Sequence, residues 1–583
     1  MSESQTTASG DRQSLLLFQL GPVQEFIAQA RSTRDLWSGS YLLSWLMAHA
    51  IKAVVTEGQL HDNAVVFPSL QGAANPLVLA LRNRRVPINP EQALTPNIPN
   101  RFMVVVPEQR AKALAQTAEA AVKHELRTIG ESVWSLLQTN KYQLEATYRP
   151  RWDYQVGAFP QCAWAYVPLT GADTWQEAFA NVNQALAARR NTRDFEQWIS
   201  CPDETKKKEA VNSNLSLLKD SLSGKEEVIG SESFWKRLKE NSLFDKASGH
   251  SYGAMNLIKR LWLHIDDQET SANYLANALS FFERDVFKTL KVASIPAIAA
   301  KNEKGDYVAV LAMDGDKMGE KITANSSSPQ ALQKFSATLA DFALNRVRGT
   351  VEENGGMLVY AGGDDVLALL PASQAIACAT TLRDAFKSVG NEFGFEASCG
   401  IAVGHQNAPL QMLVKEAQKA EKRAKGIYDR AALAINVYKR SGEIIEWGCK
   451  WESGALELMA EVTRLSNEEK LSGRFPYALA ALLQPYALEE SDHEALAAMR
   501  SVIEKEVEHV LSRQGAELKG EREPLLEKIN AWLASCLLSP ESNSGDSRPK
   551  TQDPETEKPD LRPQDFINLF LVETFMNRMR GDN

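Results

Sequence analysis

The stretch VYAGGDDVLALLP, residues 359–371, places two glycines and two aspartates between two apolar runs. Each run is rich in valine, tyrosine and leucine and is bounded by turn residues, which predicts two short β-strands. We expect these strands to form a hairpin with Gly362, Gly363, Asp364 and Asp365 at its tip. Glycine and aspartate are also the residues that ordinary tight turns select, so this stretch alone does not separate a structural turn from an acidic site.

The segments around the hairpin alternate between strand and helix. The strand YVAVLAMD precedes it, followed by a helix that carries Leu332, Phe335, Leu339 and Phe342 at helical spacing. After the hairpin come a helix, the strand FEASCGIAVGH and a second helix, PLQMLVKEAQKAEKRAKGIY. The order β-α-β-β-α-β predicts the ferredoxin-like arrangement, in which the first strand and the central hairpin are neighbours.

This arrangement brings four acidic residues toward one edge of the predicted sheet. Asp314 and Asp316 of MDGDKMG end the first strand, while Asp364 and Asp365 lie at the hairpin tip. Converging carboxylates repel one another unless a cation lies among them. Oxygen ligands with open positions suit Mg²⁺ or Mn²⁺, which bind a few carboxylates together with substrate phosphates. The alternative for DGD alone is a turn with a helix cap.

Several neighbours of these acids are suited to binding a nucleotide. Gly362 and Gly363 have no side chain, so a base or ribose can approach the backbone. Gly315 and Lys317 lie where DGDKMG runs into a helix, whose first N–H groups bind phosphate. Lys425 can add a point charge for the same phosphates, although a lysine on a charged helix is often simply solvated.

Length and composition set the broad class. The chain has 583 residues, 44% of them hydrophobic and 24% charged, as in ordinary globular proteins, and its length predicts three or four units. It shows neither a signal peptide nor an apolar run long enough to span a membrane, so we expect a cytoplasmic protein. The formal charge of −9 argues against a stand-alone nucleic-acid binder. Six cysteines without a CxxC pair argue against a disulfide framework and a zinc ribbon.

Longer segments carry a family resemblance. The DGD strand, the GGDD hairpin and the SCGIAVG and AEKRAKG segments resemble the palm domain shared by polymerases and diguanylate cyclases. The segments FQLGPVQEFIAQARSTRDLWSGSYLLS, VVFPSL and GAMNLIKRL are similar to Cas10/Cmr2, the large-subunit family of type III-B CRISPR effector (Cmr) complexes. The resemblance covers most of the chain from about residue 15 to 445.

The resemblance implies an α+β protein with two ferredoxin-like palm domains. The expected parts are a first, noncatalytic palm domain, a linker or degenerate zinc-ribbon-like and helical insertion, a second palm domain with the GGDD hairpin, and a C-terminal helical domain, at 1–200, 201–295, 296–448 and 449–583. Residues 541–560 have almost no apolar side chains and are expected to be disordered. The final segment FINLFLVETFMNRM is apolar enough to form a docked helix.

The same resemblance implies an activity. Members of the family respond to target RNA by converting ATP into a second messenger, usually a cyclic oligoadenylate. Two Mg²⁺ or Mn²⁺ ions would be held by Asp314, Asp364 and Asp365, with Asp364 and Asp365 as catalytic residues, and Asp316 would either help or face away. Lys425 and the DGDKMG backbone would hold the triphosphate.

The first palm domain has Gly21-Pro22 where the second has Asp314-Gly315. We therefore expect a noncatalytic pocket for the acceptor nucleotide there, with Ser38 and Ser40 of RDLWSGS in its wall. Other Cmr subunits, including the small subunit and backbone proteins, and the crRNA and target RNA are the implied partners; no membrane is expected.

Two departures from the family pattern modify this picture. The sequence begins at the first palm domain, and its single HD pair, His61-Asp62, lacks further helical histidines, so no HD nuclease is expected. Cys201 is the remnant of a zinc ribbon, so no structural zinc is expected. Two alternatives stay open: the same site joining ATP to S-adenosylmethionine, or an inactive scaffold that only holds a complex together.

Overall fold

The computed structural model describes residues 12–71, 75–82, 89–169, 175–191, 228–240, 244, 251–263, 292–486, 493–514, 516–537 and 562–580. Cys201, most of the 201–295 insertion and the 541–560 segment lie outside the described residues. The chain divides into two compact units. Unit 1 contains Met1–Ala293, Met318–Asn345 and Val359–Gly363, and unit 2 contains Ser294–Lys317, Arg346–Leu358 and Asp364–Asn583. Part of the sequence assigned to the second palm domain therefore folds with the first.

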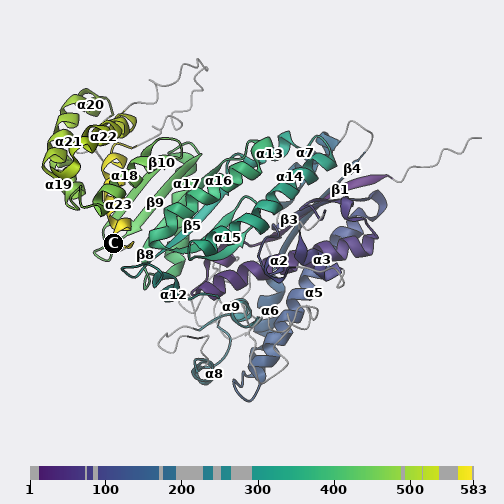
Figure 1. Ribbon diagram of the computed structural model, residues 1–583. Coiled ribbons are helices and arrows are strands. Elements are labelled where there is room, and N and C mark those ends of the chain that lie inside the picture. Colours follow the sequence, from purple (N-terminus) through teal and green to yellow (C-terminus); the bar gives the residue numbers. More distant parts are fainter. Residues whose placement is uncertain are drawn as a thin grey trace, which may run out of the picture. The chain divides into compact units, whose positions relative to one another are not determined.

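Unit 1 is built on a four-stranded sheet (Figure 1). Its strands run in the order β2-β3-β1-β4 and span Val65–Phe67, Arg101–Pro107, Gln13–Gly21 and Gln161–Leu169. The described pairings are antiparallel, and Phe18 of β1 lies opposite Phe102 of β3 with the two rings stacked. This order is the ferredoxin-like order expected for the first palm domain.

Helices cover both faces of this sheet. The long helices α2 (Thr33–Gly58) and α5 (Ala111–Gln138) pack against each other, and α5 also packs against β1 and β4 (Figure 1). The opposite face meets α7 (Trp175–Asn191), whose Phe179 and Val182 share a core with Leu15 and Leu17 of β1. The shorter helices of this part are α1 (Gln24–Ala28), α3 (Pro76–Arg82), α4 (Pro90–Ala93), α6 (Arg149–Ala158), α8 (Glu232–Leu238) and α9 (Ala254–Leu261).

Helix α14 (Pro329–Phe342) also belongs to unit 1, although its sequence lies within the second palm segment. Its Leu332 joins the core built around Leu15 and Leu17. Its Ser336 Oγ accepts a hydrogen bond of 2.8 Å from the backbone N–H of Ser69. The predicted apolar face is confirmed, and the sheet that receives Leu332 is the first one.

The second sheet has six strands in the order β10-β9-β8-β5-β7-β6. In chain order, β5 to β10 span Tyr307–Gly315, Met357–Ala361, Val366–Pro371, Ala397–His405, Ala432–Tyr438 and Ile444–Lys450. Strands β5 to β8 reproduce the predicted β-α-β-β-α-β core, while β9, parallel to β8, and β10 extend it beyond the prediction. Helices α16 (Ala375–Val389) and α17 (Leu410–Gly426) pack on β5 and β8. The short helices α12, α13 and α15 span Ile295–Ala299, Met318–Ala324 and Arg348–Glu353.

The C-terminal part of unit 2 is helical, as predicted. Helices α18 to α23 span Ala455–Asn467, Phe475–Leu483, His493–Ala498, Arg500–Gln514, Arg522–Leu537 and Asp565–Asn577. Helix α23 packs against β10, α18 and α19 and buries ten of its residues, which confirms the predicted docked helix. Within the described residues, no helix has the length and apolarity needed to cross a membrane.

Glu573 of α23 gives this region a pH-dependent stability. Its side chain is buried and accepts hydrogen bonds from the hydroxyls of Thr463 (2.8 Å) and Thr574 (3.2 Å). Loss of hydration raises the pKa of Glu573 to about 7, although these hydrogen bonds oppose the shift. A carboxyl whose pKa is higher in the folded state binds its proton more tightly there, so its contribution to stability falls as pH rises from the unfolded pKa toward 7.

We expect Glu573→Gln to remove this pH dependence, since glutamine keeps an acceptor for Thr463 and carries no charge. At pH 8 the variant should be more stable by roughly 3 kcal/mol, the free energy that corresponds to the shift from the ordinary glutamate pKa. Thermal melting of both chains between pH 5 and pH 8 measures this difference. A difference in melting temperature between the two proteins that stays constant from pH 5 to pH 8 would contradict the raised pKa of Glu573.

Candidate functional site

Three of the four predicted acids lie near one another in unit 2, at the end of β5. Met313 pairs with Val366, so Asp314 follows directly in β5 while Asp365 immediately precedes β7. The carboxylates of Asp314, Asp364 and Asp365 are close enough to interact electrostatically. The structure thus brings together three of the four predicted acids.

Helix α17 adds two further groups to this cluster. Lys425 Nζ forms an ion pair with Asp314 Oδ2, and its distance to Glu421 Oε1 is 3.0 Å. The side chains of Lys425 and Glu421 are only 23% and 13% exposed, so both lie against the sheet rather than in solvent. Lys425 therefore joins the acids, as expected, and Glu421 is a site residue that the sequence prediction did not include.

The cluster carries excess negative charge. Loss of hydration raises the pKa of Asp365 well above its usual range, and the carboxylates of Asp314, Asp364 and Glu421 raise it further while Lys425 opposes them. Loss of hydration also raises the pKa of Glu421. Burial lowers the pKa of Lys425, but its pairing with Asp314 and Glu421 outweighs burial, so the pKa lies above its usual range. The carboxylates that act on Asp365 thus outnumber the one lysine beside them.

Backbone geometry explains why two positions near the site, 363 and 400, are occupied by glycine. Gly363, at the hairpin tip, has φ +91°, a conformation that residues with a side chain rarely adopt. Gly400 of β8 lies under α17, where an added Cβ would be 2.1 Å from the backbone nitrogen of Glu421. Only glycine at position 400 lets α17 approach β8 closely enough to place Glu421 beside the acids.

The donor set fits a divalent cation of the Mg²⁺ type. Asp314, Asp364 and Asp365 supply carboxylate oxygens, and their mutual repulsion is what a bound cation relieves. Among the described residues, no three His, Cys, Asp or Glu side chains are already gathered closely enough to hold a metal ion by themselves. Mg²⁺ is typically held by one or two carboxylates together with substrate phosphates, so this arrangement suits an ion that arrives with a nucleotide.

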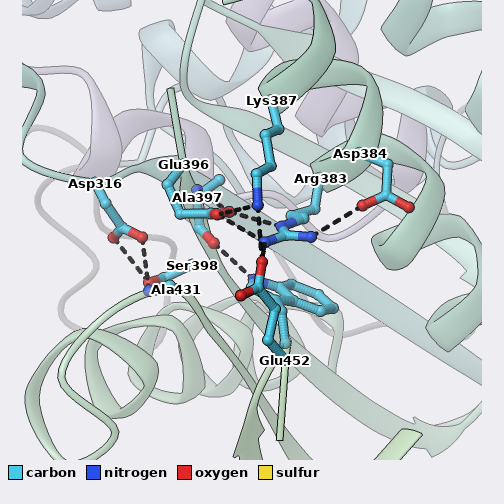
Figure 2. A network of polar contacts seen from close by, with 10 residues as sticks. Asp316, Arg383, Asp384, Lys387, Glu396, Ala397, Ser398, Ala431 and Glu452 are labelled. Carbon is cyan, nitrogen blue, oxygen red and sulfur yellow. Dashed lines mark hydrogen bonds and ion pairs between the residues drawn. The ribbon is translucent and has the colours of Figure 1, made fainter. Parts of the chain in front are cut away.

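Asp316 does not point into the cluster. One of its carboxylate oxygens accepts a hydrogen bond from Ser398 Oγ and the other accepts one from the backbone N–H of Ala431, both at 2.8 Å (Figure 2). Of the two expectations for Asp316, the structure supports the one in which it faces away. Gly315 ends β5, and the next residue after Asp316, Lys317, is exposed with φ +55°.

The structure gives no support for Ser38 and Ser40 as the wall of an acceptor pocket. Both side chains are buried in α2. Ser38 Oγ donates to the carbonyl of Lys259 at 2.6 Å and accepts from Trp262 Nε1 at 2.8 Å, and Ser40 Oγ donates to the carbonyl of Leu36. Ser38 therefore connects α2 to the α9 region, while the bond of Ser40 stays within α2. Gly21 lies at the end of β1, as expected, and its bond to Pro22 is cis.

His61 and Asp62 lie on the surface of unit 1, as expected. His61 is exposed, and Asp62 begins a short 3₁₀ segment and forms an ion pair with Arg82. The cysteines that the structure describes are free thiols, as expected for a chain without disulfides, and they are Cys162, Cys378, Cys399, Cys449 and Cys536.

Comparisons with known proteins agree with this architecture. The family described as "CRISPR-associated protein Cmr2, N-terminal" matches residues 15–131, and "Cas10/Cmr2, second palm domain" matches residues 307–434. The second match contains Asp314, Asp316, Asp364, Asp365 and Glu421. The CRISPR system Cmr subunit Cmr2 of Pyrococcus furiosus is 25% identical over an alignment 647 residues long, and this alignment covers 89% of this chain and 72% of that protein.

Solved structures show the same fold. A type III-B Cmr-beta structure in the apo state matches with a TM-score of 0.62 and 12% identity, covering 97% of this chain and 82% of that one. Cmr-beta bound to cognate target RNA matches with a TM-score of 0.59, 12% identity and coverage of 97% and 83%. An apo Csm1–Csm4 cassette matches with a TM-score of 0.53, 14% identity and coverage of 98% and 71%. The two family matches and the Cmr2 relative show that the chain belongs to the Cas10/Cmr2 family, and the solved structures show that it shares their fold.

Proposed function

We propose that the chain is the Cas10/Cmr2 subunit of an RNA-guided type III-B Cmr effector complex and that its second palm domain makes a nucleotide second messenger from ATP when target RNA binds. The observation that carries the proposal is the cluster of Asp314, Asp364, Asp365 and Glu421 around Lys425. A purely structural hairpin has no need for four carboxylates at one point. Similarity to Cmr2 and to a Cmr-beta complex bound to target RNA supports the assembly and the RNA partners.

The proposed reaction is nucleotidyl transfer. The 3′-oxygen of one adenosine attacks the α-phosphorus of ATP, its hydroxyl proton is released, and the bond to the leaving pyrophosphate breaks. Two Mg²⁺ or Mn²⁺ ions held by Asp314, Asp364 and Asp365 would supply activation of the 3′-hydroxyl and neutralisation of the phosphate charge. The usual product in this family is a cyclic oligoadenylate.

Lys425 and the hairpin backbone have separate roles in this reaction. Lys425 pairs with Asp314 and Glu421 in the structure, so its ammonium group is already held among the acids. When a triphosphate enters, Lys425 exchanges a carboxylate for phosphate oxygens and compensates their charge. In this proposal Gly362 and Gly363 would border the base and ribose, and the DGDKMG backbone, with Gly315 and Lys317, would border the phosphates; the Tyr360 side chain lies against Gly362 in the structure. Gly21 would border the acceptor nucleotide in the first palm domain.

Mass spectrometry of the products tests this function. The complex assembled with this chain is incubated with target RNA, ATP and Mg²⁺, with and without S-adenosylmethionine. We expect a cyclic oligoadenylate from ATP alone. A conjugate of adenylate with S-adenosylmethionine, formed only when ATP and S-adenosylmethionine are both present, would show that S-adenosylmethionine is the acceptor. The donor site for ATP would be the same. The absence of any new nucleotide product from a target-bound complex would contradict the proposal and favour the scaffold.

A further inference from the structure

Asp316 is only two residues from Asp314, yet its side chain is buried and bonds to other parts of unit 2. It is 4% exposed, and its two carboxylate oxygens accept the hydrogen bonds from Ser398 and Ala431 described above. Its own backbone N–H donates to the carbonyl of Glu396 at 2.8 Å. Asp316 therefore joins the end of β5 to the start of β8 and to the segment that follows α17.

The segment that Asp316 holds has a strained backbone. Asp429, Arg430 and Ala431 have φ values of +45°, +64° and +44°, so three successive residues with side chains occupy the left-handed region. Such conformations persist only where the surrounding structure holds them, and they concentrate at functional sites. Asp316 binds the N–H of the third residue of this turn, and the N–H of Trp451 donates to the carbonyl of the same residue at 3.0 Å.

The strained turn is connected to the catalytic face of α17. The N–H of Arg430 donates to the carbonyl of Ala424 at 3.0 Å, and Ala424 is the neighbour of Lys425 in the last turn of the helix. The position of the 429–431 turn therefore fixes the end of α17. From this end Lys425 reaches Asp314, and one helical turn earlier Glu421 reaches Lys425.

The other attachment points of Asp316 are rigidly held (Figure 2). Arg383 donates to both carboxylate oxygens of Glu396 at 2.6 Å and also contacts Glu452 at 3.2 Å. Trp451 Nε1 donates to the carbonyl of Ala397 at 2.8 Å. These bonds fix the start of β8. Asp316 is bonded to this part of the chain, and so its carboxylate is held in place where it binds the 429–431 turn.

We propose that Asp316 is a positioning residue of the nucleotidyl-transfer site: its carboxylate holds the strained 429–431 turn and, through α17, keeps Lys425 directed at Asp314. This inference rests on the proposed function, because Lys425 acts on phosphate only in that reaction. It assigns Asp316 no contact with metal or nucleotide. Its role therefore depends on hydrogen bonds rather than on negative charge: asparagine can accept the Ala431 N–H with its carbonyl oxygen and donate from its NH₂ group to the Ser398 hydroxyl, which then acts as the acceptor.

The test compares Asp316→Ala, Asp316→Asn, Lys425→Ala and the double variant Asp316→Ala/Lys425→Ala in the assembled complex. Asp306→Ala is the matched control, since Asp306 precedes the opposite end of β5 and its side chain is 61% exposed. Hydrogen–deuterium exchange of residues 424–431 reports the turn without requiring any activity. Turnover of ATP as a function of Mg²⁺ concentration reports the site.

We expect Asp316→Ala to speed amide exchange in 424–431 and to lower turnover about 10- to 100-fold, as misplaced catalytic groups do, with an unchanged Mg²⁺ requirement. Asparagine should restore most of the protection and turnover. The double variant should be no slower than Lys425→Ala, because both changes remove the same contribution.

Two results would overturn the positioning role. The first is Asp316→Asn being as damaging as alanine and needing more Mg²⁺, which would make Asp316 a metal ligand. The second is exchange in 424–431 that stays unchanged in Asp316→Ala. If the wild-type complex makes no product, the proposed function fails, and the exchange measurement on the alanine and asparagine variants still decides whether Asp316 holds the turn.

Discussion

Replacing Asp364 and Asp365 together with alanine is expected to abolish messenger synthesis while leaving the protein folded. The change removes two of the carboxylates that would hold the metal ions, and metal activation of the nucleophile and stabilisation of the developing charge each contribute several kcal/mol, so turnover should fall by roughly three orders of magnitude or more. Binding and cleavage of RNA by the assembled complex should persist, because in this family they belong to other subunits.

The double variant should be more stable than the wild-type protein, although its turnover is lost. The pKa of Asp365 is raised by burial and by neighbouring carboxylates, so ionised Asp365 costs folding free energy at neutral pH, and alanine removes that cost. An ordinary turn predicts the reverse: alanine at a hairpin tip costs roughly 1 kcal/mol and leaves activity intact. The melting temperature and ATP turnover of the double variant, beside the Asp306→Ala control, separate the two. Normal turnover in the double variant would contradict the catalytic assignment.

Deleting residues 565–583 is expected to unfold the C-terminal part of unit 2 and to prevent assembly. The deletion removes α23, whose Phe566, Leu569, Phe570 and Val572 are fully buried. Burial of each such side chain contributes about 1.5–3 kcal/mol, so their sum reaches the whole stability of a typical domain. The deletion also removes the Asp565 carboxylate that accepts a 2.9 Å hydrogen bond from Tyr428.

The matched control for this truncation is deletion of residues 541–560, a segment with almost no apolar side chains. That deletion should leave both the melting temperature and the yield of assembled complex unchanged. Thermal melting and size-exclusion chromatography of the two truncations make the comparison. Full assembly and unchanged melting of the chain lacking 565–583 would show that α23 is not a structural element.

The core of the second palm domain could be predicted because its signals are local. The hairpin 359–371 has apolar runs on both sides of turn residues, and the flanking helices have clear apolar periodicity. This order of elements specifies which strands are neighbours, and so it correctly placed Asp314 beside Asp365. Strands β9 and β10 lie outside the β-α-β-β-α-β pattern, which is complete without them.

The remaining features depend on tertiary contacts that periodicity does not encode. The apolar stripe of α14 predicts a buried face, but not that Leu332 packs on the first sheet. Glu421 lies in a helix rich in lysine and glutamate, where a solvated side chain is the ordinary expectation, and only the close approach at Gly400 places it among the acids. Ser38 and Ser40 are polar residues whose hydroxyls bond to carbonyls in the interior of unit 1.

The direction of the Asp316 side chain is a further feature that the sequence does not predict. Continuing the strand beyond Asp314 would place Asp314 and Asp316 on the same face, because side chains alternate along a strand. Strand β5 ends at Gly315, and Lys317 takes a positive φ, so the chain turns and Asp316 is directed to Ser398 and Ala431 instead. The sequence DGD alone does not contain this change of direction.

Nucleotidyl transfer at the second palm domain can be tested by a time course of pyrophosphate release from ATP by the complex assembled with the wild-type chain, started by adding target RNA. We expect release to begin when target RNA binds, to require Mg²⁺ or Mn²⁺ and to stop when the metal is chelated. No release above background from a complex that has bound its target RNA in the presence of ATP and Mg²⁺ or Mn²⁺ would contradict this activity.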